Sequence, residues 1–311
     1  MTTPSPSRLG HQDLRIGTLA GKGDQTADYI AQLLPHGFES FQINFWQELP
    51  GKPLKALAQE VHEVLDAHAQ KTGHRAVISS LGMFGNPLEN AAQLEACVAC
   101  IEACEDFGCK LFAGWPGALE DRPVDASMDA YAKAWAPVAR RAADADVRIA
   151  FENCDMHGTW DRPRFNIAHS PRAWEMMFDA LPEDNIGLEW EPCHQMNSLI
   201  DPIAQLRKWA PTGKIFHLHG KCATVMWDVI KHHGLRSGKP IVYHRHPGFG
   251  DCNWTDIISI LRLNGYRGFI DIEGWHDPVY KDDLEMTGQV HALNYLKHCR
   301  GGNYVPEPKI Q

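Results

Sequence analysis

Short apolar segments rich in β-forming residues alternate eight times with amphipathic, helix-like stretches along this chain. Each apolar segment is followed by a loop and then by a helix-like stretch, which is the pattern of repeated β–α units and a parallel sheet. The predicted strands are residues 15–20, 41–46, 76–81, 110–115, 147–153, 186–191, 214–219 and 269–273. The predicted helices are residues 24–34, 53–71, 87–107, 127–145, 170–181, 202–209, 254–264 and 284–298. Eight such units predict an α/β fold of the (β/α)8 TIM-barrel type.

A doubly wound open sheet is the main alternative to this barrel. After the first predicted strand, however, Gly17, Gly21 and Gly23 have the wrong spacing for the glycine fingerprint of a Rossmann fold. No linker rich in Pro, Ser or charged residues divides the chain, so we predict a single domain that spans all 311 residues. Within it, residues 1–13 are expected to be flexible and residues 300–311 to form a C-terminal extension.

Charge and composition exclude several kinds of partner. The formal net charge is −9 and the pI is near 6.0, whereas proteins that bind nucleic acid concentrate Lys and Arg on one face, so we expect no nucleic-acid partner. No segment approaches the roughly 18 uninterrupted apolar residues of a membrane span, and the N-terminus lacks a basic flank followed by an apolar core. We therefore predict a cytoplasmic protein with no membrane partner. Its nine cysteines are scattered, so reduced thiols are expected.

Acidic and imidazole side chains mark the ends of the fifth to eighth predicted strands. These strand ends read AFEN, LEWEPCH, FHLHGK and IDIEG, and they carry Glu152, Glu191, His194, His217, His219 and Glu273. Because side chains alternate along a strand, Glu189 and Glu191 are expected to point the same way. Pro192 ends the strand, and His194 is expected in the loop that follows. In a barrel, these groups would share one rim.

Each of these residues alone has an ordinary explanation, since a strand-end glutamate is usually solvated and a strand histidine is often a satisfied core residue. Together they are harder to explain in that way, because burying carboxylates without a cation or partner costs several kcal/mol each. Three carboxylates and one imidazole suit a divalent cation of intermediate hardness, such as manganese, cobalt, magnesium or zinc. The sequence therefore predicts a divalent-metal site at the rim.

The order of these residues resembles the xylose-isomerase-like TIM-barrel superfamily, the group of sugar phosphate isomerases/epimerases and ketose 3-epimerases. The similar features are a Glu in the fifth strand, an acid before Pro-x-His after the sixth, His-x-His-x-Lys in the seventh, a final Glu in the eighth and the loop HRHPGFGDCNW. The resemblance implies that Glu152, Glu191, His219 and Glu273 bind one metal ion, with manganese as the first candidate. It also implies a homo-oligomer.

The resemblance further implies residues that bind the substrate. His194 is expected beside the metal, in contact with a substrate oxygen, and Lys221 and Arg245 are candidates for binding substrate hydroxyls or a carboxylate. Trp115 belongs to a set of aromatic residues at predicted strand ends, where apolar walls with a few polar groups form small-molecule pockets. His157 is a further candidate for substrate binding.

Two positions depart from the family pattern. The family commonly has Asp at the position of Glu191, and it commonly has Lys-Asp where this chain has Lys221-Cys222. A longer acid at the metal moves the ion or repositions the strand end. The missing aspartate changes what can orient Lys221.

These residue types predict proton transfer on a keto sugar or a sugar acid. A metal chelated by a ketone oxygen and a neighbouring hydroxyl polarises the carbonyl and stabilises an enediolate. Glu152 and Glu273 would then act as base and acid on its two faces. Returning the proton to the opposite face inverts a carbon, and returning it to the adjacent carbon isomerises the sugar. No glycine cluster at a helix start forms a phosphate cradle, which favours a non-phosphorylated substrate.

Three different functions compete with this one. The same site could eliminate a group β to the ketone of a 3-keto sugar or glycoside, which is lyase chemistry. An apurinic-site endonuclease of the same superfamily places further histidines on the early strands, but the third and fourth strands here end SSLGMFG and FAGWPG. A non-catalytic sugar-binding barrel would have no need of the complete ligand set.

Further cysteines and histidines receive simpler interpretations. Cys97, Cys100 and Cys104 recur on one face of a predicted helix and are expected to be small packing residues. His244 and His246 could bind a second metal, with His246 the better candidate, but we expect both to be loop residues.

Overall fold

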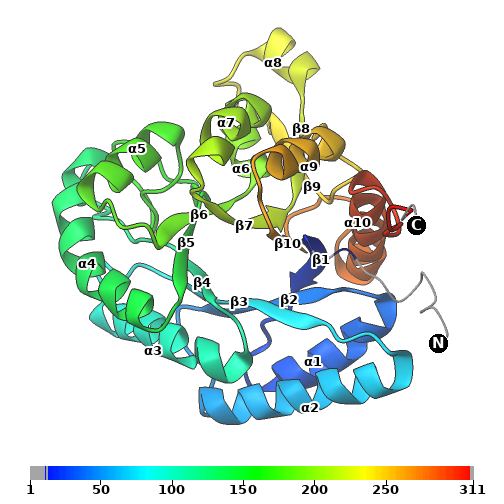
Figure 1. The fold of residues 1–311 in the computed structure, drawn as a ribbon. Coiled ribbons are helices and arrows are strands. Elements are labelled where there is room, and N and C mark those ends of the chain that lie inside the picture. The colour runs from blue at the N-terminus through cyan, green and yellow to red at the C-terminus, as the bar shows by residue number, and fades with distance from the viewer. Residues whose placement is uncertain (1–10, 12, 309–311) are drawn as a thin grey trace.

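The computed structural model describes residue 11 and residues 13–308, and its centre is a closed barrel of eight parallel strands (Figure 1). The strands follow one another around the barrel in the order β1-β10-β7-β6-β5-β4-β3-β2. They are β1 (Leu14–Leu19), β2 (Ser40–Trp46), β3 (Val77–Phe84), β4 (Leu111–Gly114), β5 (Arg148–Glu152), β6 (Ile186–Trp190), β7 (Ile215–Gly220) and β10 (Gly268–Ile272). Each overlaps a predicted strand, so the predicted (β/α)8 TIM barrel is confirmed.

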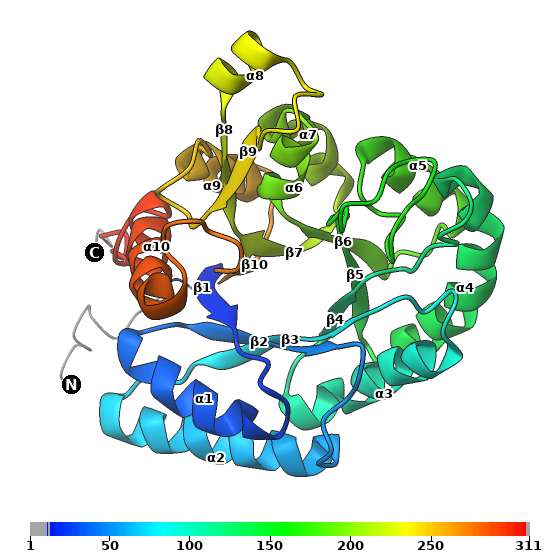
Figure 2. The ribbon, with the colours of Figure 1, turned by 180° about the vertical axis from the view of Figure 1, so that it is seen from behind.

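Helices connect successive strands and cover the outside of the barrel (Figures 1 and 2). They are α1 (Thr26–Leu33), α2 (Leu54–Thr72), α3 (Ala91–Phe107), α4 (Met128–Asp144), α5 (Pro171–Ala180), α6 (Pro192–Asn197), α7 (Pro202–Trp209), α9 (Trp254–Leu263) and α10 (Glu285–Cys299). The side chains of Asn90, Ser170, Asp201 and Asn253 accept hydrogen bonds from the first backbone N–H groups of α3, α5, α7 and α9. Residues of these types therefore set where the helices begin.

Large apolar side chains pack the helices onto the barrel. Trp135 of α4 lies edge-on to Phe151 of β5, with ring centroids 4.7 Å apart, and both residues are fully buried. Burying an apolar side chain of the size of Phe contributes roughly 1.5–3 kcal/mol. Cys97, Cys100 and Cys104 of α3 are buried in the same apolar layer, which confirms that they are packing residues.

Between β7 and α9 the chain leaves the barrel and forms an antiparallel ribbon. β8 (Cys222–Val225) pairs with β9 (Val242–Arg245), and α8 (Trp227–His233) projects away from the barrel (Figures 1 and 2). A disulfide joins Cys222 to Cys252 and ties the base of the ribbon to the segment before α9. The expectation of reduced thiols is wrong for this pair, because the sequence spacing does not reveal that the ribbon brings the two residues together.

The remaining predictions about segments concern the membrane and the two ends of the chain. Within the described part of the chain, no helix is both long enough and apolar enough to cross a bilayer. The flexibility expected for residues 1–13 falls mainly on residues 1–10 and 12, which lie outside the described residues. Of the expected C-terminal extension, residues 300–308 follow α10 without a further helix or strand, and residues 309–311 lie outside the described part.

Candidate metal centre

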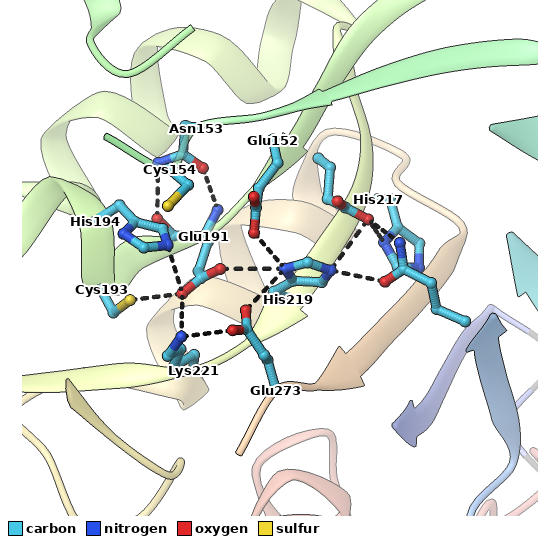
Figure 3. A network of polar contacts seen from close by, with 12 residues as sticks. Glu152, Asn153, Cys154, Glu191, Cys193, His194, His217, His219, Lys221 and Glu273 are labelled. Atoms are coloured by element: carbon cyan, nitrogen blue, oxygen red, sulfur yellow. Dashed lines mark hydrogen bonds and ion pairs between the residues drawn. The ribbon is translucent and has the colours of Figure 1, made fainter. Parts of the chain in front are cut away.

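Four side chains from four neighbouring strands meet at the carboxyl end of the barrel: Glu152 ends β5, Glu191 follows β6, His219 lies in β7 and Glu273 follows β10. His219 Nδ1 is 2.9 Å from Glu152 Oε1, 3.1 Å from Glu191 Oε2 and 3.2 Å from Glu273 Oε2. Ligand atoms of all four residues lie within 4.8 Å of one another. Figure 3 shows Glu152 and Glu273 approaching the imidazole from two sides. The structure thus brings together the four residues that were predicted to bind a metal.

The chemistry of this set fits a divalent cation. The three carboxylates are buried, and Glu273 Oε2 receives no well-oriented hydrogen bond from the described residues. Burial raises the pKa of Glu152 to about 7 in spite of its hydrogen bond with His219. Burial alone would lower the pKa of His219, but the surrounding carboxylates raise it well above its ordinary value. Three carboxylates that converge on one imidazole nitrogen supply the oxygen and nitrogen donors that divalent cations bind in proteins.

Gln42 of β2 holds the other edge of the His219 ring. His219 Nε2 lies 2.7 Å from Gln42 Oε1, and because an amide oxygen only accepts, we assign the hydrogen to Nε2. Gln42 in turn donates to Glu189 Oε1 at 2.8 Å. His219 Nδ1 is therefore the atom that faces the carboxylates. Gln42 was not among the predicted site residues, although a polar residue between apolar neighbours in the predicted strand FQINFW was a signal for it.

Glu189 and Glu191 do point the same way, as predicted. Glu189 Oε1 is 3.2 Å from His219 Nε2, and Glu191 Oε2 is 3.1 Å from His219 Nδ1. The two acids therefore contact opposite edges of one imidazole. Glu189 was not predicted to have a role, and the structure places it between the candidate metal centre and the layer beneath.

A second polar layer lies deeper in the barrel. His217 Nδ1 contacts Glu189 Oε1 at 2.8 Å, and His217 Nε2 contacts Asp271 Oδ2 at 2.9 Å. The hydroxyl of Ser40 donates to Asp271 Oδ1 at 2.6 Å, and the hydroxyl of Ser79 donates to Asp271 Oδ2. All five residues are buried. Placing His217 at the rim was therefore wrong, because strand residues two apart share a face but lie one layer apart.

Two of the predicted substrate-binding residues lie against the carboxylates. His194 Nε2 is 3.2 Å from Glu191 Oε1, and Lys221 Nζ is 2.7 Å from Glu273 Oε1 and 3.6 Å from Glu191 Oε1. His194 lies in α6 and not in a loop as predicted, because Pro192 both ends the strand and begins a helix. Burial opposes the charge of Lys221, but Glu273 and Glu191 raise its pKa well above the ordinary value. These two acids orient Lys221 in the absence of the aspartate that the family pattern has beside it.

The other three predicted substrate-binding residues differ in position. Trp115 Nε1 donates to Glu152 Oε2 at 2.5 Å, so Trp115 contacts the centre directly. Arg245 lies in β9 and is paired with Asp277, with Nε 3.1 Å from Oδ2. His157 is exposed in the loop between β5 and α5. Of these three residues, the structure brings only Trp115 to the candidate metal centre.

A pocket of about 230 Å³ opens beside Glu273, on the side of the barrel formed by β1, β2 and α10. Thr18, Asn44 and Gln289 contribute polar groups to its wall, and Trp275 contributes an aromatic ring. A concave site with an aromatic wall and a few placed polar groups suits a small hydroxylated molecule. Of the four candidate metal ligands, Glu273 lines this pocket.

The chain is similar to a known protein family and to several solved structures. The chain matches the family model described as xylose isomerase-like TIM barrel over residues 30–298. An L-ribulose 3-epimerase structure has a TM-score of 0.64 and 18% identity, covering 92% of this chain and 94% of that one. A 3-keto-D-glucoside 4-epimerase structure from E. coli has a TM-score of 0.64 and 15% identity, covering 92% of this chain and 100% of that one. The structure of a probable 3-DHS dehydratase from Bacillus anthracis has a TM-score of 0.59 and 14% identity, covering 89% of this chain and 98% of that one. At these identities the likeness shows the fold alone.

Two curated sequence relatives are inosose dehydratases. The chain is 30% identical over 132 residues to the Clostridium beijerinckii protein, which covers 41% of this chain and 42% of that relative. It is 27% identical over 128 residues to a Clostridium perfringens protein, covering 40% and 41%. The matched region thus spans about two fifths of the length of these relatives.

Proposed function

We propose that this chain, which belongs to the xylose isomerase-like TIM barrel family, is a divalent-metal-dependent isomerase or epimerase of a keto sugar or sugar acid. The observation that carries the proposal is the convergence of three buried carboxylates on His219 Nδ1. Oxygen donors with one imidazole suit manganese, with cobalt, magnesium and zinc as alternatives. The epimerases among the similar structures support this class of reaction.

A bound divalent ion would polarise the substrate carbonyl as a Lewis acid and stabilise the enediolate. The residues of the chain would move the proton. Glu152 and Glu273 lie on two sides of the centre (Figure 3), so one carboxylate can remove a proton from one face of a carbon while the other supplies a proton to the opposite face. Protonation of the same carbon inverts it, and protonation of the neighbouring carbon isomerises the sugar.

Neighbouring donors hold one oxygen of each acid–base residue. Trp115 donates to Glu152 Oε2 at 2.5 Å, and Lys221 donates to Glu273 Oε1 at 2.7 Å. The other oxygens, Glu152 Oε1 and Glu273 Oε2, face His219 and remain directed into the centre. Lys221 would also bind a substrate oxygen, because its ammonium group has three donors and lies at the edge of the acid cluster.

A second candidate function is the elimination of a group β to a ketone. The inosose dehydratases among the sequence relatives and the probable 3-DHS dehydratase among the similar structures favour it. The first step would be the same, since a carboxylate removes a proton next to the carbonyl. The proton would then leave with the departing hydroxyl as water, in place of returning to carbon.

A nuclease and a non-catalytic barrel have less support. An apurinic-site endonuclease would use additional histidines on the early strands, but β1 to β4 contain no histidine. The complete set of candidate ligands argues against a non-catalytic barrel. A cytoplasmic location, a homo-oligomer and the absence of nucleic-acid and membrane partners stay predictions.

The test combines elemental analysis with proton exchange. Purified protein is expected to contain a divalent metal, and in deuterated water it is expected to place deuterium into a ketohexose. Replacing a general acid or base typically lowers the rate by about 10²–10⁴-fold. Glu152→Gln and Glu273→Gln are therefore expected to abolish detectable exchange, whereas Glu105→Gln, on the exposed face of α3, serves as the matched control.

Two outcomes would count against the isomerase. Metal without deuterium exchange, but with water release from a keto cyclitol or 3-keto glycoside, would establish the elimination reaction in its place. Exchange that persists in both Gln variants would show that Glu152 and Glu273 are not the acid–base pair.

A further inference from the structure

Lys221 lies at the point where the chain leaves the barrel for the ribbon. β7 ends at Gly220, its last residue paired with β10, and β8 begins at Cys222, so Lys221 belongs to neither strand pairing. Its side chain is buried, and Nζ lies 2.7 Å from Glu273 Oε1 and 3.6 Å from Glu191 Oε1 (Figure 3). The position of this ammonium group therefore depends on what holds the backbone between β7 and β8.

The outer part of the ribbon offers little support to this backbone. In the segment 224–245, which the structure describes throughout, no side chain is buried. Its helix α8 has seven residues, and helices this short are not stable without packing. β9 pairs with β8, which is why His244 lies in a strand and not in a loop as predicted, whereas His246 lies in the loop that follows. The support has to come from the base of the ribbon.

A disulfide fixes that base. Cys222, the residue after Lys221, is bonded to Cys252, and both cysteines are buried. Cys252 directly precedes Asn253, whose side chain caps the N-terminus of α9. α9 packs on the barrel through apolar residues that include the fully buried Ile257. The disulfide thus ties the backbone next to Lys221 to a helix that is fixed on the barrel.

The segment before α9 packs tightly against β8. The backbone N–H of Cys252 lies 2.8 Å from Cys222 Sγ, and the backbone N–H of Asp251 donates to the carbonyl of Ala223 at 2.8 Å. A Cβ atom added to Gly250 would lie only 2.7 Å from Cys222 Sγ. Two thiols need more room than two bonded sulfurs, so breaking the disulfide would push Cys222 away from this segment. The backbone of the preceding lysine would move with it.

We propose that the Cys222–Cys252 disulfide is a positioning element that acts on Glu273 through Lys221. It holds the backbone of Lys221 so that the ammonium group binds Glu273 Oε1 and leaves Oε2 directed at His219 Nδ1. Cys222 is also a position at which this chain departs from the family pattern. The expected effect on rate rests on the proposed function, in which Glu273 transfers a proton.

The first measurement tests whether the bond exists in the purified, full-length protein. The chain has nine cysteines, of which seven are free in the structure. Alkylation of the unfolded, unreduced protein is therefore expected to label seven thiols, and reduction with dithiothreitol is expected to expose two more. Reduction breaks the S–S bond, places a hydrogen on each sulfur and oxidises the dithiol to its own cyclic disulfide. Nine labelled thiols before reduction would overturn the proposal.

The second measurement follows Lys221 itself. Because its ammonium group is buried and paired, it is expected to react slowly with an N-hydroxysuccinimide ester, as measured by peptide mass spectrometry. Reduction of the folded protein, or the double substitution Cys222→Ala with Cys252→Ala, is expected to speed this acylation. Lys55 of α2, whose side chain is 85% exposed, is the internal control and is expected to react at an unchanged rate. This measurement needs no substrate.

The third measurement is the rate of deuterium exchange into a ketohexose. A displacement of about 1 Å near the reacting groups can cost about 100-fold in rate, so reduction is expected to lower kcat by about that factor. The double variant is expected to show the same loss and no further response to dithiothreitol. Cys97→Ala, which replaces a buried cysteine of α3 outside the pair, is the matched control and is expected to keep both the rate and the sensitivity to reduction.

A crosslink that only stabilises the fold would give a different result. Reduction would then lower the resistance to denaturant but leave kcat and the acylation of Lys221 unchanged, and this outcome would overturn the proposal. Circular dichroism establishes that each form is folded, and reduced wild-type protein carries the test if the double variant does not fold. Faster acylation of Lys221 after reduction, without exchange in any form of the protein, would support the positioning role and count against the proposed function alone.

Discussion

His217 and His219 lie two residues apart in β7 and point into the same barrel, but their partners differ. Both ring nitrogens of His217 have a carboxylate partner, at 2.8 Å in Glu189 and at 2.9 Å in Asp271. His219 has one nitrogen bound to Gln42, and its other nitrogen faces three carboxylates at once. Both ring nitrogens of His217 are therefore satisfied. His219 Nδ1 can donate only one hydrogen, but three carboxylate acceptors surround it.

This difference between the two histidines shows how a metal site can be distinguished from a buried ionic network. In the deeper layer, His217 and two serine hydroxyls supply the donors that Asp271 needs. In the upper layer, Glu273 Oε2 has no hydrogen-bond partner among the described residues, and the pKa of Glu152 is raised by burial to about 7. The same residue types thus indicate a cation only where donors and acceptors do not match.

The largest expected effect tests whether the deeper layer is structural. Asp271→Asn removes one charge of a fully buried pair, and breaking such a pair typically costs about 3–5 kcal/mol of unfolding free energy. The loss is expected whether metal is present or not, and chemical denaturation measures it. The exposed Asp144→Asn on α4 is the control, with no measurable change expected. Wild-type stability of Asp271→Asn would show that the deeper layer does not hold the barrel together.

The fold followed from the sequence because local patterns determine it. Alternation of apolar segments and helix-like stretches predicted all eight barrel strands. The ribbon of β8 and β9 was not predicted, since its strands are four residues long and partly exposed. His194 was placed in a loop because a proline after a strand signals both an end and a helix start, and the sequence does not say which.

The four candidate ligands were found from the sequence because each lies at or next to a strand end, where the barrel gathers side chains. Gln42 was missed because its partners come from β6 and β7, far along the chain. The separate layers of His217 and His219 were missed for a related reason. Alternation gives the face of a strand residue, but the depth depends on how neighbouring strands are staggered.

A smaller effect tests the upper layer through metal removal. A ligand at 100 times its dissociation constant stabilises the folded state by about 2.7 kcal/mol. Manganese added to chelator-treated wild-type protein is therefore expected to raise the unfolding free energy by about that amount, as measured by denaturation at fixed protein concentration. His219→Asn is expected to lose this increment, and Asp271→Asn is expected to keep it. An increment that disappears in Asp271→Asn alone would place the metal in the deeper layer and reverse the comparison.

The smallest effect tests the contact between the two layers. Gln42→Leu removes the acceptor that fixes His219 Nε2–H, and loss of such an outer partner typically weakens metal binding by about 10–100-fold, or about 1.4–2.7 kcal/mol. Isothermal titration with manganese measures the dissociation constant, and Gln59→Leu on the exposed face of α2 is the control. Because the metal would bind at the opposite nitrogen, the number of bound ions is expected to stay the same. An unchanged dissociation constant would show that the three carboxylates alone orient His219, and that the deeper layer contributes nothing to the site above it.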